Sequence, residues 1–202
     1  MSQFGRVVLA TANPHKTTEL AAVLERVLSG WSVEPRPDGL PDVIEDADTF
    51  VGNARLKAQA LVRATGSSAL ADDSGLVVDA LGGAPGVRSS RFAGEKASDA
   101  DNVNRLLADL AAAGATNPEE RSARFTCVIL LLHPDGTEVT VQGQVEGVIA
   151  DQPSGGGGFG YDPVFVPAEG DGRTFAQMSA DEKNSISHRG RALERLAEVL
   201  TN

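Results

Sequence analysis

The chain has 202 residues, of which 41% are hydrophobic and 23% are charged, and this composition is typical of a globular domain. Eighteen basic residues against 28 acidic residues give a formal net charge of −10. This balance argues against a protein that binds nucleic acid or an anionic membrane surface. The single cysteine excludes an intramolecular disulfide and a thiolate zinc cage. We therefore expect a soluble cytoplasmic protein.

The first third of the chain alternates extended and helical patterns. Residues 6–11 form a β-branched run typical of a buried strand. Asn13 and Pro14 then suit the start of a helix, whose apolar residues recur at spacings of three and four until Gly30. A loop over residues 35–42 and a second helix over 49–64 follow.

The middle of the chain contains further strands and a third helix. Residues 68–71 favour a strand, residues 72–75 have the composition of a tight turn, and an extended piece follows them. Ser98 begins a capping box before the third helix. Residues 124–133 and 138–149 are two β-rich runs, and the Pro-Asp-Gly sequence between them predicts a hairpin.

The last quarter contains a glycine run, a short strand over residues 164–166 and a final helix. Ser179 and Glu182 form a capping box before this helix. No internal repeat or low-complexity linker interrupts the chain. We therefore predict a single α/β domain over residues 1–202, built on a mixed sheet.

The first candidate site is the segment from Thr11 to Lys16, where a strand leads into the N-terminus of a helix. Free backbone amides and the helix dipole attract phosphate at such a position, and the Lys16 ammonium adds a positive charge. The alternative is ordinary helix capping beside a solvated lysine. The segment lacks the spacing of a P-loop.

The second candidate site is acidic. Glu45, Asp46 and Asp48 precede the second helix, and Asp72 and Asp73 are adjacent. One or two carboxylates together with substrate phosphates suit Mg²⁺. Side chains of neighbouring strand residues point to opposite faces, so only one of the adjacent pair can face a given site. The sequence does not say which one, and a solvated turn remains the alternative.

The third candidate site is the glycine run and the residues after it. The glycines suggest mobility, Phe159 and Tyr161 offer aromatic faces for a base, and the Asp162 carboxylate can accept a hydrogen bond from a base edge. The alternative is a flexible loop whose aromatic side chains belong to the core.

The fourth candidate site is on the predicted final helix. Lys183 and His188 are five residues apart, so we expect them to flank one face of that helix. His188 and Arg189 are adjacent donors suited to a carbonyl group of a ligand. An ordinary charged helix surface is the alternative. Cys127 is expected in the core, and the three histidines lack the spacing of metal ligands.

Six blocks of sequence, in order along the chain, resemble the inosine triphosphate pyrophosphatase family, also called HAM1-like proteins. The blocks are Thr11-Ala-Asn-Pro-His-Lys16 with Glu19, Glu45 ahead of Thr49-Phe50 and Asn53-Ala-Arg-Leu-Lys57-Ala58, Ala71-Asp-Asp-Ser-Gly-Leu76, Gly82-Gly-Ala-Pro-Gly86 with Arg91, Gly158-Phe-Gly-Tyr-Asp-Pro163, and Glu182-Lys183 with Ser187-His-Arg-Gly190.

This resemblance implies a hydrolase that cleanses the nucleotide pool by converting ITP, dITP and XTP to monophosphate and pyrophosphate. It implies Mg²⁺ as cofactor and a homodimer, whereas the expectation of no nucleic-acid or membrane partner rests on the net charge. The implied fold is an elongated mixed β-sheet with flanking helices, which form two lobes around a central cleft.

The resemblance also implies a role for each matching residue. Asp73 is the expected catalytic proton acceptor and metal ligand, with Glu45 as a further metal ligand. His188 and Arg189 are expected to contact the 6-carbonyl of the base, because adenine would present donors to these donors. The other expected substrate-binding residues are Thr11, Ala12, Asn13, Pro14, His15, Lys16, Ser74, Phe159, Gly160, Tyr161, Asp162 and Lys183.

Three competing functions remain possible from the sequence. A Maf-like pyrophosphatase would act on pyrimidine or modified nucleotides, and a nucleotide sensor would bind without hydrolysis. A purely structural or interaction protein is the third alternative, although no exposed heptad or repeat supports it.

Overall fold

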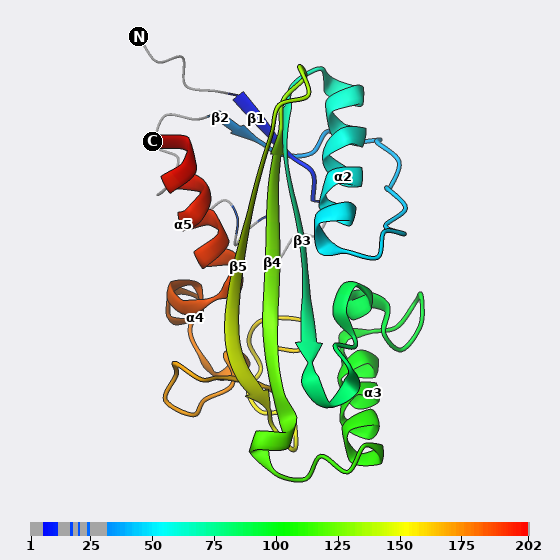
Figure 1. Ribbon diagram of the computed structural model, residues 1–202, viewed down its shortest axis with the longest axis vertical. Helices are drawn as coiled ribbons and strands as arrows, with labels where there is room; N and C mark the ends of the chain where they lie inside the picture. Colours follow the sequence, from blue (N-terminus) through cyan, green and yellow to red (C-terminus); the bar gives the residue numbers. More distant parts are fainter. Residues whose placement is uncertain (1–5, 12–16, 18–19, 21–23, 25–31, 202) are drawn as a thin grey trace. The chain divides into compact units, whose positions relative to one another are not determined.

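The computed structural model describes residues 6–11, 17, 20, 24 and 32–201. Six strands form one sheet in the order β2-β1-β3-β4-β5-β6 (Figure 1). Strand β1 pairs in parallel with β2 and β3, whereas β5 pairs with β6 in antiparallel fashion, so the predicted mixed sheet is confirmed. The strands are β1 (Arg6–Leu9), β2 (Ser32–Glu34), β3 (Ser68–Val78), β4 (Ser122–Leu132), β5 (Glu138–Ile149) and β6 (Phe165–Pro167).

Four α-helices have defined bounds, and Thr17, Leu20 and Leu24 are also helical, within the predicted first helix. Short 3₁₀ helices connect several elements. No helix in the described parts of the chain has both the length and the apolar character needed to cross a membrane. The helices are α2 (Phe50–Thr65), α3 (Asp99–Ala112), α4 (Ala180–Ile186) and α5 (His188–Thr201), with 3₁₀ helices at Asp79–Leu81, Gly86–Arg91, Pro118–Arg121 and Phe175–Gln177.

The chain divides into two compact units. Unit 1 comprises Met1–Asp73, Cys127–Gly143 and Arg189–Asn202, and unit 2 comprises Ser74–Thr126 and Gln144–His188. Strands β3, β4 and β5 each contribute residues to both units.

Unit 1 has two apolar layers because alternate strand residues point to opposite faces of the sheet. Helix α5 packs on one face and α2 on the other, and Figure 1 shows these helices on opposite sides of the strands. Because both faces of the sheet are covered, side chains on both sides of β4 are buried, which explains its continuous apolar run. The α5 layer includes Val7, Leu9, Leu20, Leu24, Leu70, Cys127, Ile129, Leu131, Leu193 and Leu196, and the α2 layer includes Val8, Ala10, Ala54, Ala58, Leu61, Ala69, Ala71, Val128 and Leu130.

Unit 2 has a separate core in which α3 packs against the strands. Aromatic rings are concentrated in it: the Phe125 and Phe165 rings lie 4.8 Å apart edge to face, and the Phe165 and Phe175 rings lie 5.1 Å apart. The core consists of Leu76, Val78, Val103, Leu106, Leu110, Ala115, Ala123, Phe125, Val145, Ile149, Tyr161, Val164, Phe165 and Phe175.

Local signals set several boundaries, and the helix predicted over residues 49–64 is observed as α2, Phe50–Thr65. Helix α2 begins where the Thr49 hydroxyl accepts a hydrogen bond from Gly52 N, and it ends at Gly66, whose φ of 64° is left-handed. Helix α3 begins at the predicted Ser98 capping box. The turn between β4 and β5 is closed by a hydrogen bond from His133 N to Thr137 O.

Two predictions about secondary structure are wrong. Residues 72–75 lie inside the continuous strand β3 instead of a turn, because the two aspartates are buried and paired with cations. The final helix is two helices, because Ser187 is extended, with φ of −72° and ψ of 155°. Lys183 and His188 therefore belong to different helices and do not flank one helix.

Candidate active site

Part of the predicted phosphate-binding segment falls outside the described residues, namely Ala12, Asn13, Pro14, His15 and Lys16. Thr11 is described and is half-buried, directly after strand β1. It follows Ala10, whose backbone N donates a hydrogen bond to Leu70 O on β3. The position of Thr11 is therefore set by the parallel pairing of β1 and β3.

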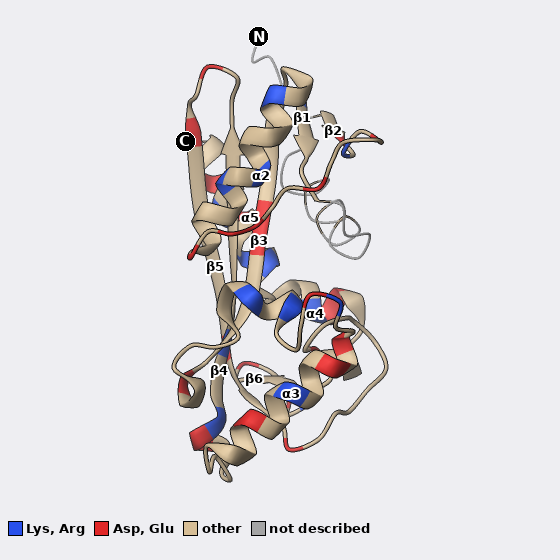
Figure 2. Cartoon of the chain, turned by 90° about the vertical axis from the view of Figure 1, so that its right-hand side faces the viewer, with Lys and Arg blue, Asp and Glu red and all other residues tan. Residues whose placement is uncertain are grey.

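Asp73 is the centre of a buried polar cluster in unit 1. Its carboxylate, in β3, accepts hydrogen bonds from Lys57 Nζ at 3.0 Å and from Asn53 Nδ2 at 3.3 Å. The same Lys57 ammonium donates to Glu45 Oε2 at 2.9 Å. The predicted carboxylates Glu45 and Asp73 thus converge on one cation. Figure 2 shows acidic residues both on the segment before α2 and on β3.

Helix α2 supplies the two partners of Asp73. Asn53 and Lys57 are four residues apart and therefore share one face of the helix. Both residues lie in a block that resembles the family, but the resemblance implied no role for either of them. Their four-residue spacing, within the helix that Thr49 caps, is the signal that could have identified them as a pair.

The charge of Lys57 is maintained despite burial. Burial alone would lower its pKa, but the carboxylates of Asp73, Asp72 and Glu45 outweigh this effect and raise the pKa above its ordinary value. Lys57 is therefore a protonated ammonium at neutral pH.

Asp72 has different surroundings from its neighbour. Its carboxylate lies 3.6 Å from the Arg189 guanidinium at the start of α5, and both side chains are almost fully buried. Strand alternation explains the difference, because adjacent residues of β3 face the α5 layer and the α2 layer respectively. Asp73 therefore shares a face with the Glu45 segment, and Asp72 does not.

The carboxylates of unit 1 fit a Mg²⁺ ion in their chemistry. Glu45 and Asp73 provide hard oxygen donors that already converge on one positive charge. Over the described ranges, no group of three or more histidine, cysteine, aspartate or glutamate side chains is arranged to hold a metal. The pair of carboxylates suits Mg²⁺, which commonly takes one or two protein carboxylates and completes its coordination with phosphates and water.

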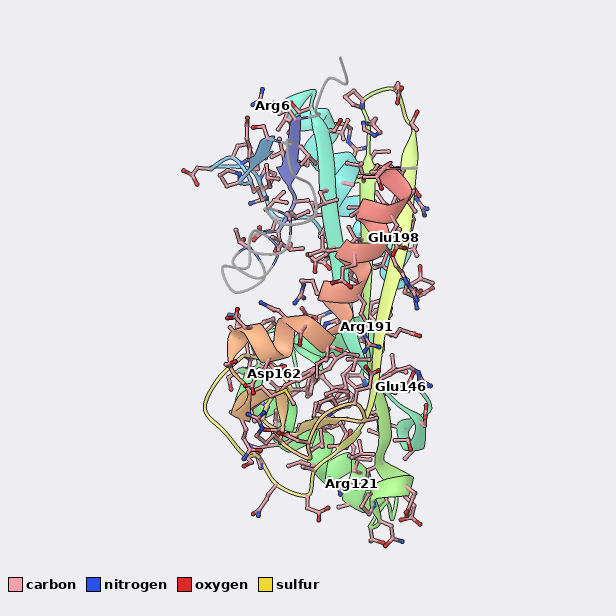
Figure 3. All side chains as sticks on the ribbon, turned by 90° about the vertical axis from the view of Figure 1, so that its left-hand side faces the viewer. Arg6, Arg121, Glu146, Asp162, Arg191 and Glu198 are labelled. Carbon is pink, nitrogen blue, oxygen red and sulfur yellow. The ribbon has the colours of Figure 1, made fainter. Side chains whose placement is uncertain are left out.

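Asp162 organises the predicted base-binding loop in unit 2. Its Oδ2 accepts hydrogen bonds from Phe159 N at 2.9 Å and from Lys183 Nζ at 2.7 Å. Figure 3 shows Asp162 beside helix α4, which carries Lys183. A Cβ on Gly158 would lie 2.0 Å from that same oxygen, and the φ of Gly158 is +69°. Glycine is required there because the carboxylate occupies the space of a side chain.

An aromatic surface surrounds the Lys183–Asp162 ion pair. Lys183 Nζ lies 4.9 Å from the centre of the Phe159 ring and 5.7 Å from that of Phe175. The side chains of the ion pair are only 6% and 4% exposed. A buried ammonium is stabilised by its carboxylate and by the ring faces together. This places three of the predicted residues, Phe159, Asp162 and Lys183, in one cluster.

Tyr161 belongs to the core of unit 2. Its side chain is buried, and its hydroxyl donates to Ser89 O at 2.9 Å. The ring thus lies in the core, as one of the two interpretations of the sequence expected, and a contact of Tyr161 with a base stays a prediction. Gly160 lies beside it in sequence, and its backbone N donates to Asp99 Oδ2 at 2.7 Å.

The glycine run packs closely against other backbone. A Cβ on Gly155 would lie 2.5 Å from the carbonyl group of Ala176, and Gly157 N donates to Ala176 O at 3.0 Å. These glycines therefore permit close contact with the 3₁₀ helix Phe175–Gln177. The sequence suggested mobility because it does not show this contact.

His188 is buried and its ring stacks on Phe125, with centroids 4.8 Å apart and planes 10° apart. It is the last residue of unit 2, and Arg189 is the first residue of the following segment of unit 1. Ser74 is half-buried and is the first residue of unit 2.

Comparisons with known proteins give a consistent result. The model of the Ham1 family matches residues 7–199. A dITP/XTP pyrophosphatase of Streptomyces avermitilis is 49% identical over 200 residues, covering 96% of each chain. A HAM1 protein from Coxiella burnetii has 43% identity and a TM-score of 0.88, covering 98% of this chain and 99% of that one. A nucleoside-triphosphatase, or dITP/XTP pyrophosphatase, from Mycobacterium abscessus has 43% identity and a TM-score of 0.76, covering 96% and 99%.

Proposed function

The chain belongs to the Ham1 family, and from this premise we propose that it hydrolyses dITP, XTP and ITP to the nucleoside monophosphate and pyrophosphate. The observation that best supports this chemistry is the convergence of Glu45 and Asp73 on one cation position. A triphosphate bound to a protein with a net charge of −10 requires local positive charge. Lys57 provides part of it.

In unit 1, Glu45 and Asp73 would hold Mg²⁺, which when bound offsets negative charge on the phosphates and on the leaving pyrophosphate. Asp73 orients a water molecule and accepts its proton. The water oxygen forms a bond to the α-phosphorus, the bond from that phosphorus to the bridging oxygen breaks, and pyrophosphate leaves with its electron pair. Asn53 and Lys57 hold the Asp73 carboxylate while it acts. Catalysis therefore consists of positioning and electrostatic stabilisation.

The residues of unit 2 suit an uncharged aromatic ring. Phe159 offers a ring face whose neighbours Lys183 and Asp162 neutralise each other. His188 would donate to the 6-carbonyl of inosine or xanthosine, as would Arg189, which follows it in the chain and belongs to unit 1. Adenine would leave these buried donors unpaired, at a cost of about 1–3 kcal/mol each, which disfavours ATP.

Three further properties belong to the proposal. Thr11 and the segment that follows it would bind the triphosphate, as the resemblance implies. The enzyme would be a homodimer and would act on the cytoplasmic nucleotide pool. Light scattering at several protein concentrations measures the oligomeric state directly, and a mass equal to one chain would refute the dimer.

The decisive assay is pyrophosphate release from a panel of nucleotides with and without Mg²⁺. We expect dITP, ITP and XTP to be hydrolysed only with Mg²⁺, and ATP, dTTP and UTP to be poor substrates. A preference for dTTP or UTP would instead support a Maf-like enzyme. Binding of dITP without release of pyrophosphate would support a nucleotide sensor.

The same assay identifies the base. Asp73→Asn should lower kcat by about 10²- to 10⁴-fold, the usual contribution of a general base, while the variant still binds dITP. Asp72→Asn is the matched control, because its carboxylate faces Arg189. If Asp72→Asn lost the greater part of kcat and Asp73→Asn retained it, the two roles would be reversed.

A further inference from the structure

The side chain of Asn53 connects two parts of the acidic cluster that are distant in sequence. Its Oδ1 accepts a hydrogen bond from Ala47 N at 3.0 Å, and its Nδ2 donates to Asp73 Oδ2 at 3.3 Å. Ala47 is two residues after Glu45. One fully buried amide therefore bonds both to the segment that carries Glu45 and to the predicted base.

The amide makes both contacts because it carries an acceptor and a donor on separate atoms. The backbone N–H of Ala47 requires an acceptor, and the ionised carboxylate of Asp73 requires a donor. Aspartate at position 53 would keep the acceptor and lose the donor, and alanine would lose both. An unpaired buried polar group is costly in free energy, so both hydrogen bonds are strongly favoured once the segment is packed.

A second feature holds the same segment. A Cβ on Gly52 would lie 2.6 Å from Ala47 Cβ, so the absence of a side chain at position 52 lets the segment approach the first turn of α2. Lys57 cannot replace this function, because a flexible ammonium is a point charge without directional preference. The amide of Asn53 is neutral and its hydrogen bonds have a preferred direction. It can therefore hold the Asp73 carboxylate and the Ala47 backbone in place whatever the local charge.

We propose that Asn53 is a positioning residue that fixes Asp73 relative to the segment carrying Glu45. This inference rests on the proposed function, because it assumes that the two carboxylates act together. It predicts that loss of the Asn53 contacts lowers kcat through misplacement of Asp73, and that KM changes much less.

Unit 2 contains a matched control. Asn102 is also the fourth residue of its helix, is 2% exposed, and accepts a hydrogen bond from Ala93 N at 2.8 Å. Its Nδ2 donates to Ser90 O, a backbone carbonyl, at 3.2 Å. The two asparagines thus have the same structural task, but only Asn53 contacts a carboxylate of the site.

The experiment compares Asn53→Asp with Asn102→Asp, using thermal unfolding and the kinetics of dITP hydrolysis. Both variants should lose stability. Asn53→Asp should lower kcat by about 10- to 100-fold, the range for a misplaced catalytic group, with KM within about 3-fold of the wild type. Asn102→Asp should retain kcat within about 2-fold. Equal values of kcat in the two folded variants would overturn the proposal.

A second measurement does not depend on activity. Hydrogen–deuterium exchange over residues 44–48 should be faster in Asn53→Ala, which loses both contacts, and close to the wild type in Asn53→Asp, which keeps the bond to Ala47 N. Unchanged exchange in Asn53→Ala would overturn the proposal even if Asn53→Asp were too unstable to assay. Failure of the proposed function is distinguishable, because the wild type itself would then release no pyrophosphate.

Discussion

In the described part of each unit a lysine pairs with carboxylate, but the two lysines have different surroundings. Lys57 in unit 1 is shared by Glu45 and Asp73, with Asp72 adding to the negative potential. Lys183 in unit 2 has one close carboxylate partner, Asp162, among the ion pairs of the described residues, and lies over two phenylalanine rings.

The difference separates the two kinds of chemistry that a nucleotide requires. The Lys57 cluster has more negative than positive charge, which favours a divalent cation and, through it, phosphate. The Lys183–Asp162 pair is neutral as a whole and is bordered by aromatic faces, which favour an uncharged base. The four predictions below test this contrast, from the largest expected effect to the smallest.

Lys57→Met should produce the largest effect. It removes the ammonium from two carboxylates, one of which is buried, and breaking a buried ion pair in this way costs about 3–5 kcal/mol. Mg²⁺ should restore part of the lost stability, because the cation replaces the missing charge. The measurement is the unfolding midpoint in urea, with and without Mg²⁺.

Lys183→Met is the matched control for this rescue. It also breaks a buried ion pair, but it leaves one carboxylate among aromatic rings, so Mg²⁺ should not stabilise it beyond the gain of the wild type. Equal rescue of the two variants would remove the distinction between the clusters.

Gly158→Ala should produce the next largest effect. The new Cβ would collide with the Asp162 carboxylate, and alanine is strained at a φ of +69°, so we expect a loss of about 2–4 kcal/mol and a higher KM for dITP. Gly156 lies in the same loop, and a Cβ there would meet nothing within 4 Å. Gly156→Ala should therefore change stability by less than about 0.5 kcal/mol. Chemical denaturation of both variants checks the prediction, and equal losses would contradict it.

His188→Phe tests the selectivity for the base. Phenylalanine preserves the ring that stacks on Phe125 but removes the N–H donors. The ratio of kcat/KM for ITP to that for ATP should fall by about 10-fold, since the lost donor discriminated against adenine. An unchanged ratio in this folded variant would exclude His188 from base selection.

Glu182→Gln should produce the smallest effect, and it depends on pH. Hydrogen bonds from Arg173 and from the Ser179 backbone lower the pKa of Glu182 from 4.5 to about 2. Its charge therefore stabilises the fold above pH 4.5, and this contribution decreases as the pH falls toward 2. The difference in melting temperature between wild type and variant should be greatest near neutral pH and vanish in acid. A constant difference over this range would contradict the assignment.

The elements that the sequence predicted well depend on short-range signals. Thr49 and Ser98 each cap a helix within their own turn, and the Pro-Asp-Gly turn closes its hairpin over a few residues. The identities of a few neighbouring residues are enough to specify a helix cap or a hairpin turn. The strand bounds Glu138–Ile149 were predicted without error for the same reason.

The errors arose where a distant residue decides the structure. Asp72 and Asp73 have the composition of a turn, but Arg189 and Lys57 pair with them and stabilise a strand. The break at Ser187 and the burial of Tyr161 against Ser89 also depend on tertiary packing. For the site, the residue types could be predicted, but the shared cation of Glu45 and Asp73 required the fold.

Because the phenol of Tyr161 is buried, its ultraviolet absorbance reports on the folding of unit 2. The sequence has one tyrosine, and burial raises its pKa well above the ordinary value of 10. In alkaline solution the near-ultraviolet absorption band of its phenolate should therefore be absent while unit 2 is folded. The band should appear as that unit unfolds, so that unfolding can be followed by absorbance without any dye or label.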